Sequence, residues 1–261
     1  MKITIVQMEI TDGNKELNLN KALDILSEIS NQSNLPDMVC FPELFTSGYD
    51  LTKVSLLAES IPGPTIDKIA KITQGKFMVL GSILEKEGLD YYNTAFILNN
   101  KGVLIGKYRK THLFSPMLEK DYLTAGNEIK TFIVPEWDDM KIGIAICYDL
   151  RFPELFRALA LKGAKIVFVP SEFPSPKQKV WKTLLTARAI ENQIFIIGIN
   201  RVGQGKTDHF FGYSLVTNGI YIDHLEDFPE VKTFEIETDS LDELKSTLPL
   251  LKDRRDDIYQ V

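Results

Sequence analysis

The sequence predicts a layered α/β fold containing a mixed sheet, and three features support that prediction. Short runs of β-branched and apolar residues alternate along the chain with segments whose apolar residues recur at helical spacing. No Pro- or Ser-rich linker, low-complexity stretch or repeat interrupts the alternation, so residues 1–261 are expected to form a single domain. Asn99-Asn100-Lys101-Gly102 has the composition of a tight hairpin turn, which joins antiparallel strands and makes the sheet mixed.

The expected elements follow from these patterns in chain order. Residues 1–8 are rich in β-branched residues and predict a strand, and residues 18–29 repeat apolar side chains at helical spacing, so the chain opens with a β-α unit. Gly163 is placed as the C-terminal stop of a later helix. Further strands are expected at 37–42, 77–84, 93–99, 103–108, 141–146, 165–169, 194–200 and 210–223, further helices at 65–72, 153–162 and 180–192, and a loop at 115–128.

Composition and charge exclude several classes of function. With 44% hydrophobic and 25% charged residues, the chain is typical of a globular protein with a buried core. Its 30 Lys and Arg against 36 Asp and Glu give a net charge of -6, which repels a polyanion, so nucleic acid is not an expected partner. The basic run 107–110 is interrupted by Tyr108 and is expected to be a solvated strand end.

Cysteine usage and apolar runs indicate the compartment. Cys40 and Cys147 are the only cysteines, and they form neither a disulfide framework nor a closely spaced pair for metal binding or redox exchange. The first ten residues lack the continuous apolar segment of a signal peptide, and no run approaches the roughly 20 apolar residues of a membrane span. These features predict a cytoplasmic protein that does not bind a membrane.

The most informative segment, residues 144–153, is an apolar strand that delivers Cys147 to the junction before a helix. A helix N-terminus lowers the pKa of a thiol placed there, and free N–H groups, first that of Tyr148, can bind an oxyanion. Cys147 could equally be a small buried hydrophobe, which is the usual fate of a free cysteine. Its placement alone does not decide between these two interpretations, so the neighbouring motifs decide.

Two other strand ends carry charged groups that would complete a hydrolytic site. Glu43 follows Pro42 and could accept a thiol proton and later donate it to leaving ammonia, and Lys110 could acidify the cysteine and stabilise an oxyanion. Taken singly, such a glutamate is more often a helix N-terminal charge and such a lysine is nearly always solvated. Because ligands of α/β sheets collect at the carboxyl ends of strands, the three groups together predict a catalytic site.

These motifs resemble those of the nitrilase superfamily of carbon-nitrogen hydrolases. The marks of that family are a glutamate in a Pro-Glu context, a lysine in Arg-Lys-x-His-Leu and a cysteine followed by Tyr-Asp-x-Arg-Phe-Pro-Glu, and they stand here in order at Glu43, Lys110 and Cys147. Glu119 matches the second glutamate of the family, and residues 187–192 and 253–256 match later signatures. The resemblance therefore covers nearly the whole chain.

The resemblance implies an α/β fold in the form of a four-layer α-β-β-α sandwich of two mixed sheets. It also implies a homodimer or larger homo-oligomer with no metal and no organic cofactor. By this likeness Cys147 is the nucleophile, Glu43 the general base, Lys110 the oxyanion-stabilising proton donor and Glu119 a positioning acid. The reaction would be hydrolysis of a small carboxylic amide through a cysteine acyl-enzyme, with release of ammonia.

The residues after the cysteine indicate the branch of the superfamily. Tyr148-Asp149-Leu150-Arg151 resembles the amidase and omega-amidase group, whereas Trp-Glu is typical of nitrilases and Asn-Asp-Arg of carbamoyl hydrolases. Residues 181–203 are similar to bacterial omega-amidases, which act on 2-oxo dicarboxylic acid monoamides. The alternatives are an aliphatic amidase, a carbamoyl hydrolase or a nitrilase, since residues 171–176, which shape the pocket in this family, depart from its pattern.

Several side chains are candidates for contacting the substrate. Candidates for the pocket wall are the aromatic residues Tyr49, Phe173 and Trp181, for which ordinary core packing is at least as good an explanation, and Tyr148 is expected to bind the substrate through its backbone N–H. Arg151 could bind a substrate carboxylate. A partly buried arginine needs a partner, however, so an ion pair with Asp149 or Glu154 is the expected arrangement.

Two other classes of function fit parts of the sequence. A papain-like enzyme would pair the cysteine with His112, His209 or His224, but the papain-type context around the nucleophile is missing. A non-enzymatic binding protein could keep the fold after losing catalysis. Retention of all four polar catalytic positions argues against that role, because buried charges are costly to keep without use.

Overall fold

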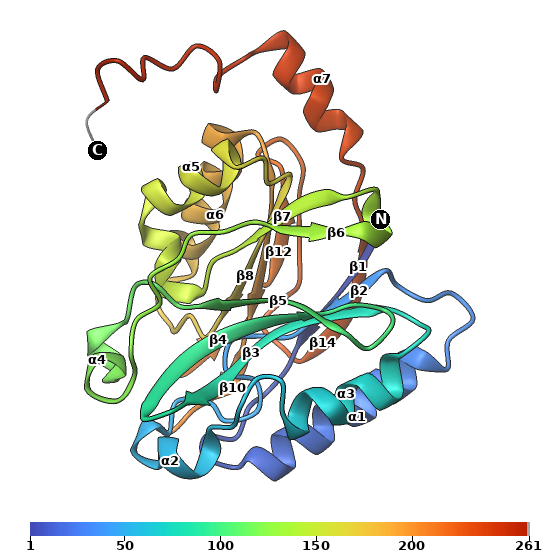
Figure 1. Cartoon of the computed structure of the whole chain (residues 1–261), viewed down its shortest axis with the longest axis vertical. Coiled ribbons are helices and arrows are strands. Elements are labelled where there is room, and N and C mark those ends of the chain that lie inside the picture. Colours follow the sequence, from blue (N-terminus) through green and yellow to red (C-terminus); the bar gives the residue numbers. More distant parts are fainter. Residues whose placement is uncertain (260–261) are drawn as a thin grey trace.

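Two six-stranded sheets pack face to face in the computed structural model, which describes residues 1–259 (Figure 1). The first sheet contains, in spatial order, β14 (Glu230–Glu235), β1 (Lys2–Gln7), β2 (Met38–Cys40), β3 (Met78–Glu87), β4 (Asp90–Leu98) and β5 (Leu104–Arg109). The second contains β13 (Ile222–His224), β12 (Leu215–Thr217), β9 (Phe195–Asn200), β8 (Ile166–Ser171), β7 (Met140–Ile144) and β6 (Phe132–Val134). A separate two-stranded ribbon pairs β10 (Val202–Gln204) with β11 (His209–Phe211).

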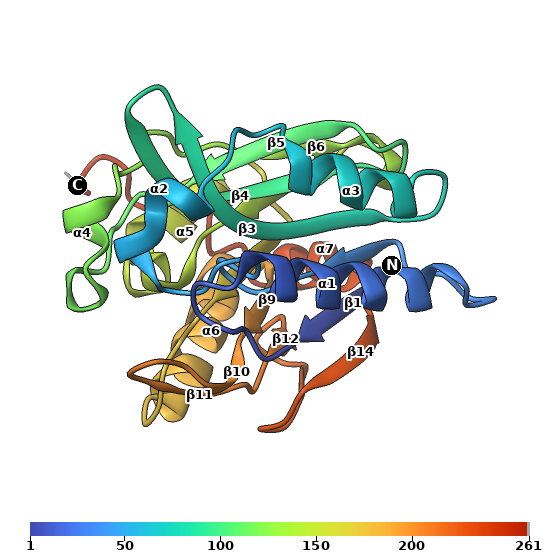
Figure 2. The same ribbon diagram turned by 90° about the horizontal axis from the view of Figure 1, so that it is seen from below.

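Helices cover the outer face of each sheet. Figure 2 shows α1 and α3 side by side on the first sheet, while α5 and α6 lie against the second. The helices are α1 (Lys15–Ser30), α2 (Val54–Leu57), α3 (Pro64–Thr73), α4 (Glu119–Tyr122), α5 (Pro153–Leu161), α6 (Gln178–Asn192) and α7 (Asp239–Thr247). The four-layer α-β-β-α sandwich of two mixed sheets is therefore confirmed.

Parallel strands form the centre of each sheet, and this places their carboxyl ends together. β1, β2 and β3 are parallel neighbours, and so are β7, β8 and β9. Parallel neighbours need a crossover connection, which α1 and α3 provide in the first sheet and α5 and α6 in the second. The segments that follow β2, β7 and β8 carry Glu43, Cys147 and Glu172.

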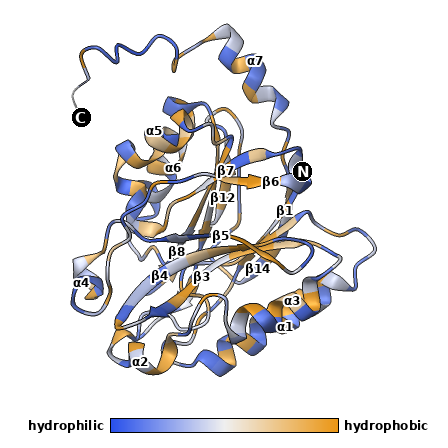
Figure 3. Ribbon diagram, in the orientation of Figure 1, coloured by the Kyte–Doolittle hydropathy of each residue, from blue (hydrophilic) through white to orange (hydrophobic). Residues whose placement is uncertain are grey.

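The main core lies between the two sheets. Alternate residues of β1 point to opposite faces, so Ile3 and Ile5 contact the core between the sheets, while Val6 packs under the helices with Leu26 of α1. Because both faces of the central strands are buried, these strands are mostly apolar, and orange predominates in several of them in Figure 3. α1 shows orange and blue residues in turn, as expected of a helix with one buried face.

Most of the expected elements are present within a few residues of the expected bounds. In the hairpin between β4 and β5, Gly102 has a φ of 76° and Asn99 Oδ1 accepts from the backbone N–H groups of Lys101 and Val103. The loop expected at 115–128 is interrupted by α4, and the strand expected at 210–223 is divided into β11, β12 and β13. β6, β14 and α7 were not expected from the sequence.

The C-terminal part of the described chain lies apart from the sandwich. In Figure 1, α7 and the segment after it project from the edge of the molecule. Gln193 Nε2 donates to the Leu248 carbonyl oxygen at 2.6 Å, and Leu251 packs partly against the main core. Among residues 1–259, no helix is both long and apolar enough to cross a bilayer.

Candidate active site

A buried lysine held between two buried glutamates forms the centre of the candidate site. Glu43 follows β2, Lys110 directly follows β5 and Glu119 begins α4. The Lys110 ammonium lies 2.8 Å from Glu43 Oε1 and 2.8 Å from Glu119 Oε2, and all three side chains are fully buried. Burial alone would lower the pKa of Lys110, but the carboxylates of Glu119 and Glu43 raise it above its usual value, so the ammonium stays charged.

Further hydrogen bonds fix the two glutamates. Asn93 on β4 donates through Nδ2 to Glu43 Oε1 at 2.7 Å, and Ser82 on β3 donates to Asn93 Oδ1 at 3.0 Å. The Tyr49 hydroxyl lies 2.7 Å from Glu43 Oε1 and 2.9 Å from Glu119 Oε1. Sequence reasoning did not identify Asn93 or Ser82, whose only signal is a polar residue in an otherwise buried strand.

Cys147 lies at a strained turn after β7. Its φ is 44°, and it begins the 3₁₀ turn Cys147–Arg151. A non-glycine residue in this left-handed region costs conformational energy and persists where its surroundings hold it there. α5 begins at Pro153, where a helix was expected, and the 3₁₀ turn lies between Cys147 and that helix.

The buried Asp149 holds this turn in place. Its Oδ2 accepts from the Ile146 N–H and from the Tyr108 hydroxyl, both at 2.8 Å. Its Oδ1 accepts from the His112 N–H at 3.0 Å and lies 2.7 Å from His112 Nδ1. The His112 ring stacks on Phe152 and, within residues 1–259, makes no hydrogen bond with the Cys147 thiol, which interacts with Glu43 instead, so the geometry does not support a papain-like pairing.

A second buried charge supports the same turn from α6. Arg188 donates through Nε and Nη2 to the Leu150 carbonyl oxygen at 3.2 Å and 3.0 Å. Its guanidinium also lies 5.6 Å from the centre of the Phe156 ring. Arg188 belongs to the 187–192 segment that was singled out by resemblance, and the structure assigns it the task of holding the turn.

The electrostatic environment of Cys147 favours the thiol over the thiolate. Burial raises the pKa of Cys147 well above its usual value, the carboxylate of Glu43 raises it further, and Lys110 opposes these effects. The helix N-terminus and Lys110 were expected to give Cys147 a lowered pKa, and this expectation is wrong, because the net effect of its surroundings is a raised pKa. The resting nucleophile is a neutral thiol, and a base must remove its proton.

A small pocket opens onto Cys147. Its cavity volume is about 10 Å³, and its walls include Tyr148, Phe173, Phe114 and Glu172 as well as the nucleophile. A cavity of roughly 10–15 Å³ holds one water molecule, so the pocket leaves room only for a small group beside Cys147.

Two of the expected wall residues lie elsewhere. Trp181 is fully buried behind Phe173, with their ring centres 5.2 Å apart, and its indole N–H donates to the Tyr213 carbonyl oxygen at 2.8 Å. Tyr49 contributes its hydroxyl to the cluster of Glu43 and Glu119 instead of forming part of the wall.

Two cations flank the mouth of this pocket. The Arg151 guanidinium lies 5.4 Å from the centre of the Phe173 ring, and the Lys177 ammonium lies 5.8 Å from that of Phe114. Within residues 1–259 neither cation forms an ion pair, so the expected pairing of Arg151 with Asp149 or Glu154 is wrong. An unpaired guanidinium and an unpaired ammonium at one opening can attract an anionic group of a ligand.

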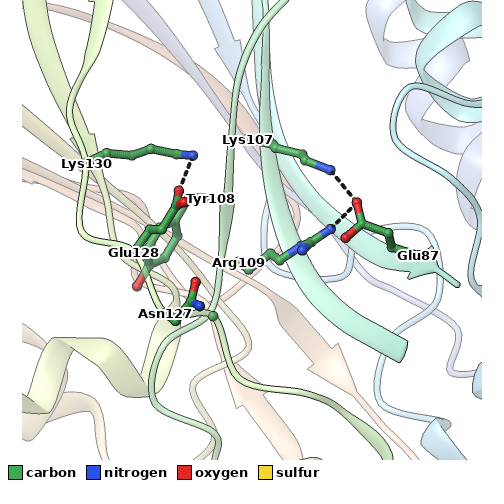
Figure 4. A pocket seen from close by; sticks show the side chains of 8 residues that line it. Glu87, Lys107, Tyr108, Arg109, Asn127, Glu128 and Lys130 are labelled. Atoms are coloured by element: carbon green, nitrogen blue, oxygen red, sulfur yellow. Dashed lines mark hydrogen bonds and ion pairs between the residues drawn. The ribbon is translucent and has the colours of Figure 1, made fainter. Parts of the chain in front are cut away.

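A larger hollow of about 200 Å³ lies away from the nucleophile, beside the outer end of β5 (Figure 4). Glu87 contacts Arg109 at 2.8 Å and Lys107 at 3.6 Å, and Glu128 contacts Lys130 at 2.6 Å. These mutually paired surface charges have no nucleophile near them. They also show why the basic run 107–110 is divided, since Lys107 and Arg109 point to the surface while Lys110 is buried in the site.

Comparisons with known proteins agree with this geometry. The family model "Carbon-nitrogen hydrolase" matches residues 2–245. The chain is 36% identical over 262 residues to the 2-oxoglutaramate amidase of Bacillus subtilis, covering 98% of both chains, and 28% identical over 273 residues to the omega-amidase NIT2 of Mus musculus, covering 100% of this chain and 97% of that protein. Among solved structures, a glutamate-to-glutamine mutant of the amidase from Nesterenkonia sp. AN1 superposes on this chain with a TM-score of 0.82 at 25% identity, covering 98% of this chain and 94% of that one. That structure shows the acetamide moiety of fluoroacetamide covalently added at the active-site cysteine.

Proposed function

This chain belongs to the carbon-nitrogen hydrolase family, and on that basis we propose that it hydrolyses the terminal amide of 2-oxo dicarboxylic acid monoamides through an acyl-enzyme on Cys147. The observation that carries the proposal is the position of Cys147 beside a buried lysine that is shared by two glutamates. The family makes this chain an enzyme that acts on C–N bonds. The assignment of each residue to a step is the proposal.

In the first half of the reaction Glu43 removes the proton from the Cys147 thiol, whose raised pKa requires a base. The sulfur attacks the amide carbon, and the charge that develops on the carbonyl oxygen is stabilised by the Lys110 ammonium and the Tyr148 N–H. Glu119 positions Lys110 through its 2.8 Å contact and is itself fixed by the Phe114 N–H at 2.6 Å. Lys110 therefore reaches the oxyanion without a conformational change.

In the second half the protonated Glu43 gives its proton to the amide nitrogen, the C–N bond breaks, and ammonia leaves a thioester on Cys147. Glu43 then accepts a proton from a water molecule, which attacks the thioester carbon. The C–S bond of the tetrahedral adduct breaks, the acid product leaves, and the released Cys147 thiolate takes the proton from Glu43. Since one carboxylate serves both halves, the three hydrogen bonds that hold Glu43 Oε1, from Lys110, Asn93 and Tyr49, are expected to keep it in one position throughout.

Two observations support a substrate that carries a carboxylate. Arg151 and Lys177 both line the pocket of Cys147 without an ion-pair partner in residues 1–259. The similarity to the 2-oxoglutaramate amidase and to an omega-amidase points in the same direction. A carboxylate at the far end of the acyl chain would bind these cations while the amide lies against Cys147.

We further propose that the enzyme works as a homodimer or larger homo-oligomer in the cytoplasm. The projecting C-terminal segment exposes Leu248, Ile258 and Tyr259, each by half or more of its surface, which suits packing against a neighbouring copy. Cys40 and Cys147 are both free thiols, and a thiol nucleophile remains active in a reducing compartment.

The test compares kcat/KM for 2-oxoglutaramate, a short aliphatic amide and the matching nitrile. We expect the order just given, because a site built for a carboxylate leaves cations unpaired when that group is absent. A nitrile forms a thioimidate that must keep its nitrogen through a hydration step, whereas Glu43 is placed to expel ammonia. A preference for the aliphatic amide would leave the family standing and remove the 2-oxo acid monoamide as substrate.

A further inference from the structure

Glu172, which the mechanism above does not use, lies in the same pocket as the nucleophile. It directly follows β8, its side chain is fully buried, and it lines the pocket of Cys147. Its backbone N–H donates to Glu43 Oε2 at 2.8 Å. The main chain of Glu172 thus supports the proposed base, while its side chain is available for another contact.

Only one oxygen of the Glu172 carboxyl group is paired. Oε2 accepts from Arg201 Nη1 at 2.6 Å, and the same nitrogen lies 2.7 Å from Asp12 Oδ1. The buried oxygen Oε1 has no hydrogen-bond partner within residues 1–259. A buried polar atom without a partner is costly, and because Glu172 lines the pocket of Cys147, a group of the ligand can supply the missing partner.

The charges around Glu172 determine whether Oε1 donates or accepts. Burial raises the pKa of Glu172 to about 8 against the opposing effect of Arg201, and the carboxylates of Asp12 and Glu43 also raise it. Near neutral pH the group is therefore largely protonated. A guanidinium only donates, so the oxygen facing Arg201 acts as an acceptor and the proton lies on Oε1. Glu172 thus presents an O–H donor to the pocket.

The position of this donor distinguishes between the oxygens of an amide substrate. Lys110 contacts Oε1 of Glu43, and the Glu172 N–H contacts Oε2 of the same carboxylate. The lysine that would stabilise the oxyanion and the main chain of Glu172 therefore bind different oxygens of Glu43. With the amide carbonyl oxygen assigned to Lys110, the O–H of Glu172 is left for another oxygen of the substrate.

We propose that Glu172 determines specificity by donating a hydrogen bond from its unpaired carboxyl oxygen to the keto oxygen on the acyl chain of a 2-oxo acid monoamide. This inference rests on the proposed function and explains how the site recognises the keto group as well as the carboxylate. Arg201 and Asp12 act as positioning residues, because they fix which oxygen of Glu172 faces the pocket.

Two isosteric variants test the inference. In Glu172→Gln, the amide oxygen can face Arg201 and the NH₂ group can replace the O–H as donor, whereas Glu172→Met has similar size and no donor. For each protein we would measure the ratio of kcat/KM for 2-oxoglutaramate to kcat/KM for glutaramate, which has the same amide, chain length and carboxylate but no keto oxygen. A ratio within one preparation does not depend on the fraction of folded enzyme, so a partly unfolded variant still gives an answer.

We expect Glu172→Met to lower this ratio about tenfold relative to wild type, and Glu172→Gln to keep it within about threefold. An equal loss for both substrates in Glu172→Met would overturn the inference, because Glu172 would then act on the shared chemistry. Equal loss of the ratio in Glu172→Gln and Glu172→Met would also overturn it, because an ionised carboxylate acting as an acceptor would be the recognising group. Wild-type enzyme that hydrolyses neither substrate would refute the proposed function, and the inference with it.

Discussion

Removing the Asp149 carboxylate is expected to cost the protein much of its stability. In Asp149→Ala, the backbone N–H groups of Ile146 and His112 lose their acceptor, whereas the Tyr108 hydroxyl can still turn to Thr111 at 2.8 Å. A buried donor without a partner costs about 1–3 kcal/mol, so the two N–H groups cost about 2–6 kcal/mol. The whole free energy of unfolding of such a domain is about 5–15 kcal/mol.

Asp149→Asn is the matched control. Its remaining oxygen can keep both contacts with His112, and only the Ile146 N–H faces an NH₂ group without an acceptor, at a cost of about 1–3 kcal/mol. Urea unfolding at a fixed protein concentration, followed by circular dichroism, measures both variants. We also expect folded Asp149→Asn to lose about 10²-fold in kcat, because the turn that holds Cys147 loosens and a misplacement of about 1 Å has that effect. An alanine variant that unfolds within about 1 kcal/mol of wild type would refute the role given to Asp149.

Four other outcomes are expected. Cys147→Ala should abolish amide hydrolysis and leave the fold intact, and turnover within tenfold of wild type would exclude the covalent mechanism. Glu43→Gln and Lys110→Ala should each lower turnover at least about 10²-fold, and normal build-up of thioester in Glu43→Gln, seen by mass spectrometry, would contradict its role as base. The pKa of Glu172 is raised from its usual 4.5 to about 8 in the folded protein, so its contribution to stability is present below pH 4.5 and is lost as the pH rises towards 8. In Glu172→Gln the free energy of unfolding, measured with urea, should therefore fall less over this pH range than in wild type. Parallel plots of that free energy against pH for the two proteins would contradict the raised pKa. Sedimentation should show a dimer or larger assembly, and a monomer at micromolar concentration would contradict the proposed oligomer.

The fold could be predicted from the sequence where local patterns and global packing agree. The apolar run before Cys147 and the helical spacing of residues 18–29 correspond to β7 and α1. β14 was missed because its apolar residues Val231 and Phe234 are three positions apart and do not alternate, and its place is fixed by antiparallel pairing with β1, more than 220 residues away in the chain. α4 was missed because a four-residue helix is too short to show periodicity.

The polar residues of the site also fall into those that a local sequence pattern indicates and those that only the tertiary fold identifies. Glu43, Lys110 and Cys147 stand at strand ends within recognisable motifs, so the sequence indicates them. Asn93, by contrast, is part of the long strand β4, and its contact with Glu43 joins residues 50 positions apart. No local pattern separates such a residue from an ordinary polar residue of a strand, because its partner is determined by the tertiary fold.

The charges buried around the nucleophile explain why a neutral thiol suits this site. Lys110 is shared by Glu43 and Glu119, and Arg201 is shared by Glu172 and Asp12, so each cation faces two carboxyl groups. Four ionised carboxylates against two cations would leave uncompensated negative charge in a dry interior, which is costly. Burial raises the pKa of both Glu119 and Glu172, so protons take up part of that charge.

A thiolate at Cys147 in the resting enzyme would add a further negative charge to this cluster. Burial and the Glu43 carboxylate hold the thiol in its neutral form, and the transfer of its proton to Glu43 leaves the total charge of the cluster unchanged. The negative charge then moves from Glu43 to the sulfur and from the sulfur to the substrate oxygen, always within reach of Lys110. One negative charge therefore moves through the site during the reaction. The other carboxyl groups are compatible with catalysis because the protons that neutralise part of their charge, at Glu119 and Glu172, do not take part in these transfers.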